Sequence, residues 1–126
     1  MPSQPSILLA DDEPLERGSL GIMLEQEGYL VTTVEDGLAA LVQLERNQFD
    51  IVLTDIRMPR MTGMELLKQI KERKIKSEVI LITAYGEIKD AVEATKMGAY
   101  NLVEKNPNMD EKLKLIIKQA IRDKWA

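Results

Sequence analysis

Five short runs of apolar residues recur along the chain, and most are rich in branched side chains. They are Ile7–Ala10, Leu30–Val34, Ile51–Thr54, Val79–Thr83 and Asn101–Val103. Most of the runs are continuously apolar rather than alternating, which is typical of strands covered on both faces. The run Leu30–Val34 is mixed with threonine, so we expect it at an edge of the sheet.

Apolar residues between these runs recur at the spacing of helices. Pro14 lies where a first helical turn would begin, Gly28 marks its end, and Asp36 can cap the next helix. The expected buried faces are Leu38, Leu41 and Val42; Met64, Leu67 and Ile70; Ile88, Ala91, Val92 and Thr95, ended by Gly98; and Leu113, Ile116, Ile117 and Ala120. Strands that alternate with helices in this way predict an α/β fold with a parallel, doubly wound sheet.

Composition limits the chemistry that such a fold could perform. The 126 residues have the size of one domain and include neither cysteine nor histidine, so any catalysis must use carboxylates, hydroxyls and lysine. The net charge is −4 and no basic stripe stands out, which argues against direct binding of nucleic acid. The apolar run before Asp11 is too short for a signal peptide or a membrane span, so we expect a cytoplasmic protein that does not bind membranes.

Polar side chains end or closely follow four of the five apolar runs. They are Asp11 and Asp12, Asp55, Thr83 and Lys105. Each alone is unremarkable, since acidic pairs commonly cap helices and lysines commonly face water. Ligands of parallel sheets, however, bind beyond the carboxyl ends of the strands, where these side chains would meet. Repelling carboxylates there favour a bound Mg²⁺, and a carboxylate beside a cation, a lysine and a hydroxyl can accept a phosphoryl group.

Four stretches carry a resemblance to a known family. ILLADDEP, FDIVLTDIRMPRMTGMELL, VILITAYGE and GAYNLVEK, in this order, resemble the receiver domain of bacterial response regulators over nearly all of residues 1–126. Among receivers, these stretches are most similar to those of nitrogen-regulatory and related regulators. The resemblance implies one receiver domain with a flavodoxin-like fold, in which five helices surround a five-stranded parallel sheet of order 2-1-3-4-5.

The resemblance also implies a role for each candidate site residue. Asp55 would be the phosphoacceptor and a ligand of Mg²⁺, which Asp12 would bind directly and Asp11 through water. The backbone carbonyl of Arg57 would be a further ligand. Met58-Pro59 and Gly63 would shape the loop after the acceptor.

Two residues from other strand ends would contact the phosphoryl group. Thr83 would hydrogen-bond it and move toward it, and Lys105 would pair with Asp55 or its phosphate. Side chains two residues after the acceptor and two after the threonine, here Arg57 and Tyr85, govern access of water in the family, and neither is well suited to orient water for attack. We therefore expect a phosphoryl group that persists longer than in fast-cycling chemotaxis receivers.

The same resemblance implies partners. A sensor histidine kinase or a phosphotransfer protein would supply the phosphoryl group, an output domain would follow toward the C-terminus, and phosphorylation could drive homodimerisation. The chain would then be a signalling domain that catalyses only its own phosphorylation and dephosphorylation, not an enzyme acting on other substrates.

Two positions depart from the family pattern. The aromatic switch residue usual three positions before the lysine is replaced by Leu102, and Tyr100 is shifted by two positions, so it is not assigned that role. The proline that usually follows the lysine across a cis peptide is replaced by Asn106, with Pro107 after it. Because a cis bond without proline costs about 2.5–4 kcal/mol, we predict a trans Lys105–Asn106 peptide.

Three alternatives remain at this point. A phosphohydrolase with an aspartate nucleophile would need a second aspartate where this chain has Arg57. A degenerate receiver that only binds or dimerises is favoured by Leu102 and Asn106 but not by the intact acidic and basic set. A flavin-binding role would need a phosphate-cradling loop, and the acidic residues that start at Asp11 would repel phosphate unless a metal intervened.

Overall fold

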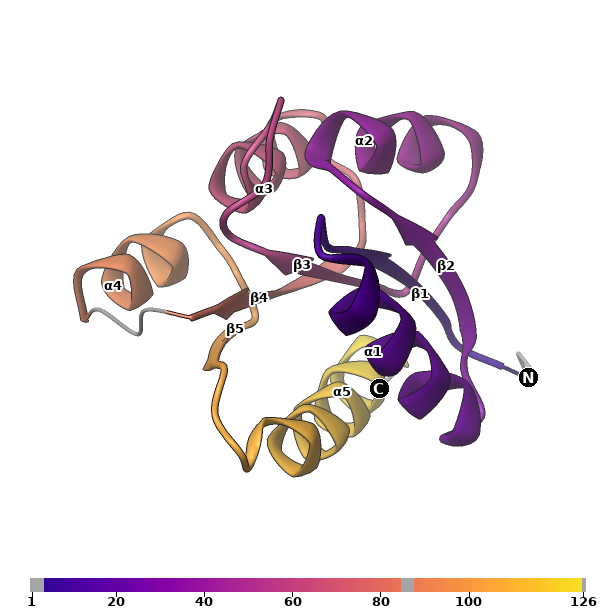
Figure 1. Cartoon of the computed structure of the whole chain (residues 1–126). Helices are drawn as coiled ribbons and strands as arrows, with labels where there is room; N and C mark the ends of the chain where they lie inside the picture. Colours follow the sequence, from indigo (N-terminus) through magenta and orange to yellow (C-terminus); the bar gives the residue numbers. More distant parts are fainter. Residues whose placement is uncertain (1–3, 85–87, 126) are drawn as a thin grey trace.

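The computed structural model describes residues 4–84 and 88–125, and within these ranges five strands alternate with five helices (Figure 1). All neighbouring strands are parallel, and their order in the sheet is β2-β1-β3-β4-β5. This order and the edge position of β2 confirm the predicted doubly wound, flavodoxin-like fold. The elements are β1 Ser6–Ala10, α1 Pro14–Gln26, β2 Leu30–Val34, α2 Gly37–Arg46, β3 Ile51–Asp55, α3 Gly63–Glu72, β4 Glu78–Thr83, α4 Ile88–Lys96, β5 Asn101–Glu104 and α5 Met109–Trp125.

Helices cover both faces of the sheet. α1 and α5 lie on one face, and α2, α3 and α4 lie on the other (Figure 1). Successive strand side chains point to opposite faces, so Ile7, Leu9 and Leu53 pack with α1 and α5, whereas Leu8 and Val52 pack with α2 and α3. Burial of each such side chain contributes roughly 1.5–3 kcal/mol, which explains why the middle of each central strand is a continuous apolar run.

Local signals set the starts of three helices. α1 begins at Pro14, as predicted, and is capped by the carboxylate of Glu13. Asp36 caps α2 by accepting a hydrogen bond from the Ala39 N–H at 2.8 Å, as predicted. α3 begins with a capping box in which the side chain of Thr62 and that of Glu65 each accept from the other's backbone N–H. None of the helices in the described part of the chain has the length and apolarity needed to cross a lipid bilayer.

The predicted buried face of α2 is wrong in part. Leu38 and Val42 are 44% and 45% exposed, and the helix buries Gly37, Ala40, Leu41 and Leu44 instead. A close approach explains this rotation, because a Cβ atom at Gly37 would lie 2.5 Å from the carbonyl oxygen of Met61. The small side of the helix therefore faces the loop before α3, and the two branched residues turn toward solvent.

The predicted face of α4 is also rotated. Val92 is 47% exposed and Thr95 is exposed, whereas Ala94 is buried against the face of the sheet that α2 and α3 also cover. This helix touches the sheet through a small side chain, so its larger apolar residues do not mark the buried side. The side chain of Ile88, which was expected on the same face, lies outside the described residues.

Candidate functional site

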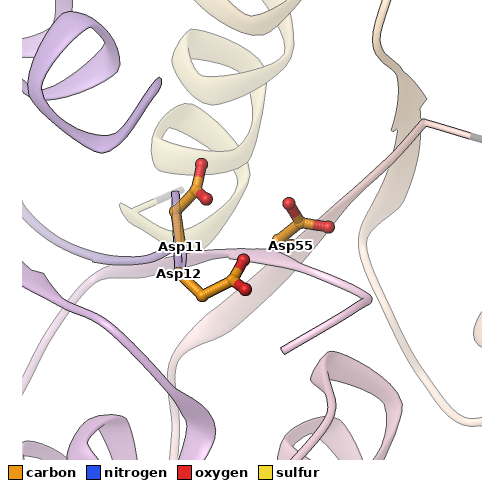
Figure 2. Close-up of side chains that lie close together, drawn as sticks. All are labelled: Asp11, Asp12 and Asp55. Atoms are coloured by element: carbon orange, nitrogen blue, oxygen red, sulfur yellow. The ribbon is translucent and has the colours of Figure 1, made fainter. Parts of the chain in front are cut away.

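Three carboxylates meet at the carboxyl ends of β1 and β3. These strands are neighbours, with Ala10 opposite Thr54, so Asp11 and Asp12 follow β1 beside Asp55 at the end of β3. One oxygen from each of the three carboxylates lies within 4.8 Å of the others. Figure 2 shows the side chains of Asp11, Asp12 and Asp55 lying close together. The predicted meeting of these residues is therefore confirmed.

Asp11 is the most deeply placed of the three carboxylates. It is only 1% exposed; its Oδ1 accepts a hydrogen bond from the Glu13 N–H at 2.9 Å, and its Oδ2 has no hydrogen-bond partner among the described residues. Burial, followed by the side-chain interaction with Glu16 and repulsion from Glu16 and Asp55, raises the pKa of Asp11 to about 7, although the Glu13 N–H opposes the change. The single hydrogen bond from the Glu13 N–H therefore does not offset the burial of the Asp11 carboxylate and the negative charge around it.

Lys105 brings positive charge to the same place. Its Nζ lies 2.6 Å from Oδ2 of Asp55, as the predicted pairing requires, and 2.7 Å from Oε1 of Glu16. Burial alone would lower the pKa of Lys105, but its interactions with Asp55 and Glu16 outweigh burial and raise the pKa above the ordinary lysine value. The backbone N–H of Lys105 donates to the carbonyl of Thr83 at 2.8 Å, which fixes the lysine beside the end of β4.

Glu16 is the site residue that the sequence reasoning missed. Burial would raise its pKa, but its interactions with Asp11 and Lys105 outweigh burial and lower it. Glu16 lies in the first turn of α1, where an acidic side chain is ordinary because it interacts well with the helix dipole. No local pattern therefore distinguishes it from a helix-stabilising glutamate.

Thr83 and Arg57 lie near Asp55 at the same edge of the sheet. Thr83 ends β4 and is 2% exposed, one residue beyond the position opposite Asp55. The Arg57 N–H donates to Oδ1 of Asp55 at 3.2 Å. Arg57 also lines an open pocket of about 490 Å³ with Asp12, Met58, Pro59 and Thr62. The role of the Arg57 carbonyl as a metal ligand stays a prediction, and Tyr85 lies outside the described residues.

The loop after Asp55 is held close to the acceptor strand. A Cβ atom at Gly63 would lie 2.3 Å from the carbonyl oxygen of Asp55, so any other residue would displace the loop. The Gly63 N–H donates to the carbonyl of Ile56 at 2.8 Å, and Met58 is buried. These contacts fit the predicted contribution of Gly63 and Met58 to the shape of this loop.

The two departures from the family pattern have clear structural positions. Leu102 is half-buried against the α2–α3 face of the sheet, whereas Tyr100 packs on the opposite face and donates its hydroxyl to Oδ2 of Asp123 at 2.8 Å. Tyr100 and Leu102 therefore lie on opposite faces of the sheet. The Lys105–Asn106 peptide is trans, as predicted, and the side chain of Asn106 accepts from the Asn108 N–H at 2.8 Å just before α5.

The donor set fits a hard divalent cation. Mg²⁺ prefers oxygen ligands, and the site supplies carboxylates from Asp11, Asp12 and Asp55 within reach of one another. The buried, unpartnered Oδ2 of Asp11 is the kind of group that a cation or a cation-bound water satisfies. A carboxylate with metal ligands on one side and an ammonium on the other is suited to attack on phosphorus.

Comparison with known proteins gives the family. A family model described as response regulator receiver domain matches residues 7–118. The chain belongs to this family of receiver domains. This receiver is 37% identical over 122 residues to the transcriptional regulatory protein FixJ of Bradyrhizobium diazoefficiens, and the match covers 97% of this chain and 59% of that protein. It is also 37% identical over 117 residues to the nitrogen assimilation regulatory protein NtrX of Azorhizobium caulinodans, with 91% of this chain and 26% of that protein covered.

Solved structures agree with this assignment. The receiver superimposes on the solution structure of the beryllofluoride-activated NtrC4 receiver domain dimer with a TM-score of 0.86 and 35% identity. The match covers 94% of this chain and 98% of that one. The chain is thus similar to whole receivers in structure but spans only 59% and 26% of the lengths of FixJ and NtrX.

Proposed function

We propose that this receiver accepts a phosphoryl group on Asp55 in a reaction that depends on Mg²⁺. The observation that carries the proposal is the place of the Asp55 carboxylate, which has the Asp11 and Asp12 carboxylates near it and Lys105 at 2.6 Å. Asp55 differs in this respect from the exposed acidic residues of the helices. The phosphohydrolase alternative is disfavoured, because the exposed arginine at position 57 cannot act as a carboxylic general acid.

The chain's own residues divide the work of transfer among them. Asp12, Asp55 and, through water, Asp11 would hold Mg²⁺, and the bound cation supplies positive charge next to the transferring group. An oxygen of Asp55 forms the new bond to phosphorus, and the leaving group of the donor takes the electron pair of the bond that breaks. Lys105 offsets charge on the phosphoryl oxygens, and the hydroxyl of Thr83 donates a hydrogen bond to one of them.

The proposed donor is a sensor histidine kinase or a phosphotransfer protein, since the receiver contains no histidine of its own. The relatives FixJ and NtrX are named as regulatory proteins and are longer than this chain, so we propose that phosphorylation controls an output domain. The structural relative NtrC4 forms a dimer when activated with beryllofluoride, which supports homodimerisation on phosphorylation here. In this role the domain catalyses only its own phosphorylation and dephosphorylation.

The test is a labelling experiment followed by intact-mass measurement. The parent is incubated with Mg²⁺ and acetyl phosphate and should gain the mass of one phosphoryl group, with no gain in the presence of a chelator. Asp55→Asn should abolish the gain and Asp12→Ala should reduce it severely, whereas Asp110→Asn in the exposed first turn of α5 serves as a matched control. A parent that is never labelled would favour the degenerate, binding-only receiver, and an Asp55→Asn variant labelled like the parent would exclude Asp55.

A further inference from the structure

Glu16 is a fourth carboxylate at the site, and besides Asp11 it contacts the lysine that the proposed reaction uses. Its Oε1 lies 2.7 Å from Nζ of Lys105, whose other contact is Oδ2 of Asp55 at 2.6 Å. The side chains of Glu16 and Lys105 are 25% and 22% exposed, so water screens this ion pair less than a fully exposed one. The Lys105 ammonium is therefore shared by two carboxylates.

The position of Glu16 is fixed by its helix. α1 starts at Pro14, and its first turn is capped by the carboxylate of Glu13. The guanidinium of Arg17 donates to the carbonyl of Asp11 at 2.8 Å and so ties this turn to the chain that follows β1. These contacts place the backbone of Glu16 close to the end of β1, and from there its carboxylate reaches Lys105.

Sharing the ammonium has a consequence for phosphoryl transfer. Lys105 can offset phosphoryl charge only to the extent that its own charge is not already satisfied by Glu16. Glu16 also adds a negative charge to a pocket where three carboxylates already attract cations and repel an anionic phosphodonor. Glu16 should therefore favour binding of the cation and disfavour transfer of the phosphoryl group.

We propose that Glu16 competes with the phosphoryl group for Lys105, which slows transfer to Asp55 while it tightens the binding of the divalent cation. This inference rests on the proposed function, because it concerns the same acceptor and the same lysine. Glu16 would be a positioning residue, since it acts through Lys105 and does not itself contact the phosphoryl group.

Glu16→Gln tests the proposal, because it removes the charge and keeps the size of the side chain. With acetyl phosphate at saturating Mg²⁺, the rate constant for labelling of Asp55 should rise about fivefold. Calorimetric titration with Mg²⁺ alone should show affinity weakened by a similar factor, about fivefold. Glu25→Gln removes the same charge from the exposed side of the same helix and should leave both quantities unchanged.

A merely structural role for Glu16 predicts something else. General loosening of the site would lower the labelling rate and the Mg²⁺ affinity together, and that result would overturn the proposal. Glu16→Met, which also removes the charge and keeps the bulk, should reproduce the opposite changes if the glutamine variant does not fold.

A double-mutant cycle with Lys105→Met tests whether Glu16 acts through the lysine. The effect of Glu16→Gln on the labelling rate should disappear in the Lys105→Met background, because there is no ammonium left to share. An effect of the same size in that background would contradict the competition. Asp55→Asn is measured in parallel: if it stays unlabelled while Glu16→Gln behaves like the parent, only the inference about Glu16 fails, and if it is labelled, the proposed function fails.

Discussion

At the scale of single residues, the acidic pocket is arranged at the expense of stability. Asp11 is buried with one unpartnered oxygen, and its neighbours Asp12 and Asp55 carry the same charge. Proteins accept such repulsion where a cation will occupy the site, because binding of the cation to the folded state returns free energy by mass action. Asp12 is exposed, so its substitution should disturb packing little.

This arrangement predicts opposite effects of Asp12→Ala with and without Mg²⁺. Without the cation, the variant should unfold at the same urea concentration as the parent or a higher one, because one repelling charge is gone. With millimolar Mg²⁺, the parent should gain stability, by about 1–3 kcal/mol if the cation is at ten to a hundred times its dissociation constant, and the variant should gain much less. Equal stabilisation of both proteins would argue against Asp12 as a direct ligand.

Arg57 leads to a prediction about the lifetime of the phosphoryl group. Its side chain is exposed beside the pocket that Asp12 and Pro59 also line, and its backbone N–H contacts Asp55. A guanidinium there can cover phosphoryl oxygens and hinder water. Arg57→Asn should therefore speed release of phosphate severalfold in a time course after removal of the donor. An unchanged rate, or a parent that discharges within seconds, would refute shielding by this residue.

At the scale of elements, Asp36 joins the start of α2 to the loop after β3. It accepts from the Ala39 N–H at 2.8 Å and pairs with Nε of Arg60 at 2.7 Å, and it is 4% exposed. Asp36→Ala should lower the free energy of unfolding by about 1–2 kcal/mol, the range for a lost helix cap, as measured by urea denaturation. Asp110→Asn, which removes an exposed acidic group from α5, should leave it nearly unchanged.

The charge of Asp36 also predicts a pH dependence. The hydrogen bond from the Ala39 N–H, helped by Arg60 and opposed by burial, holds the pKa of Asp36 below its ordinary value of 3.8. Because the folded protein then binds fewer protons than the unfolded chain, this stabilisation is present above pH 3.8 and is lost as the pH falls through the lowered pKa. The difference in stability between the parent and Asp36→Asn should shrink in that acidic range. A difference that stays constant down to that range would contradict the charge-based explanation.

A second prediction at this scale concerns α4 and β5. We expect phosphorylation to draw Thr83 toward the phosphoryl group and a neighbouring apolar side chain, with Leu102 the candidate, to fill the space. Hydrogen exchange with and without beryllofluoride should change in peptides that cover residues 88–104 and stay constant in α2. No change in residues 88–104 would indicate a module that does not switch.

The sheet and most of the site could be predicted from sequence because both depend on short-range patterns. Continuous apolar runs indicate strands buried on two faces, and the carboxyl ends of parallel strands bring Asp11, Asp55 and Lys105 together. The buried side of α2 could not be predicted, since it depends on the close approach of Gly37 to the loop before α3. Glu16 was missed for a similar reason, because its ion pair joins segments far apart in the chain.

At the scale of the whole molecule, two layers of helices cover the faces of the sheet and leave its carboxyl edge for chemistry. The residues that meet there come from the ends of β1, β3 and β5 and from the first turn of α1 (Figure 1). Binding sites of doubly wound sheets lie at this edge because loops can vary there without disturbing the core. The receiver thus combines a buried apolar core with a strongly charged pocket, as its proposed role as a phosphoryl acceptor requires.

The most direct test of that role is to locate the phosphoryl group chemically. The parent is labelled with acetyl phosphate and Mg²⁺, and borohydride then reduces the acyl phosphate, so the modified aspartate becomes homoserine. Peptide mass spectrometry should find homoserine at position 55 in the parent and nowhere in Asp55→Asn. Homoserine at Asp11 or Asp12 of the parent, or its absence from a protein that has gained a phosphoryl group, would contradict Asp55 as the acceptor.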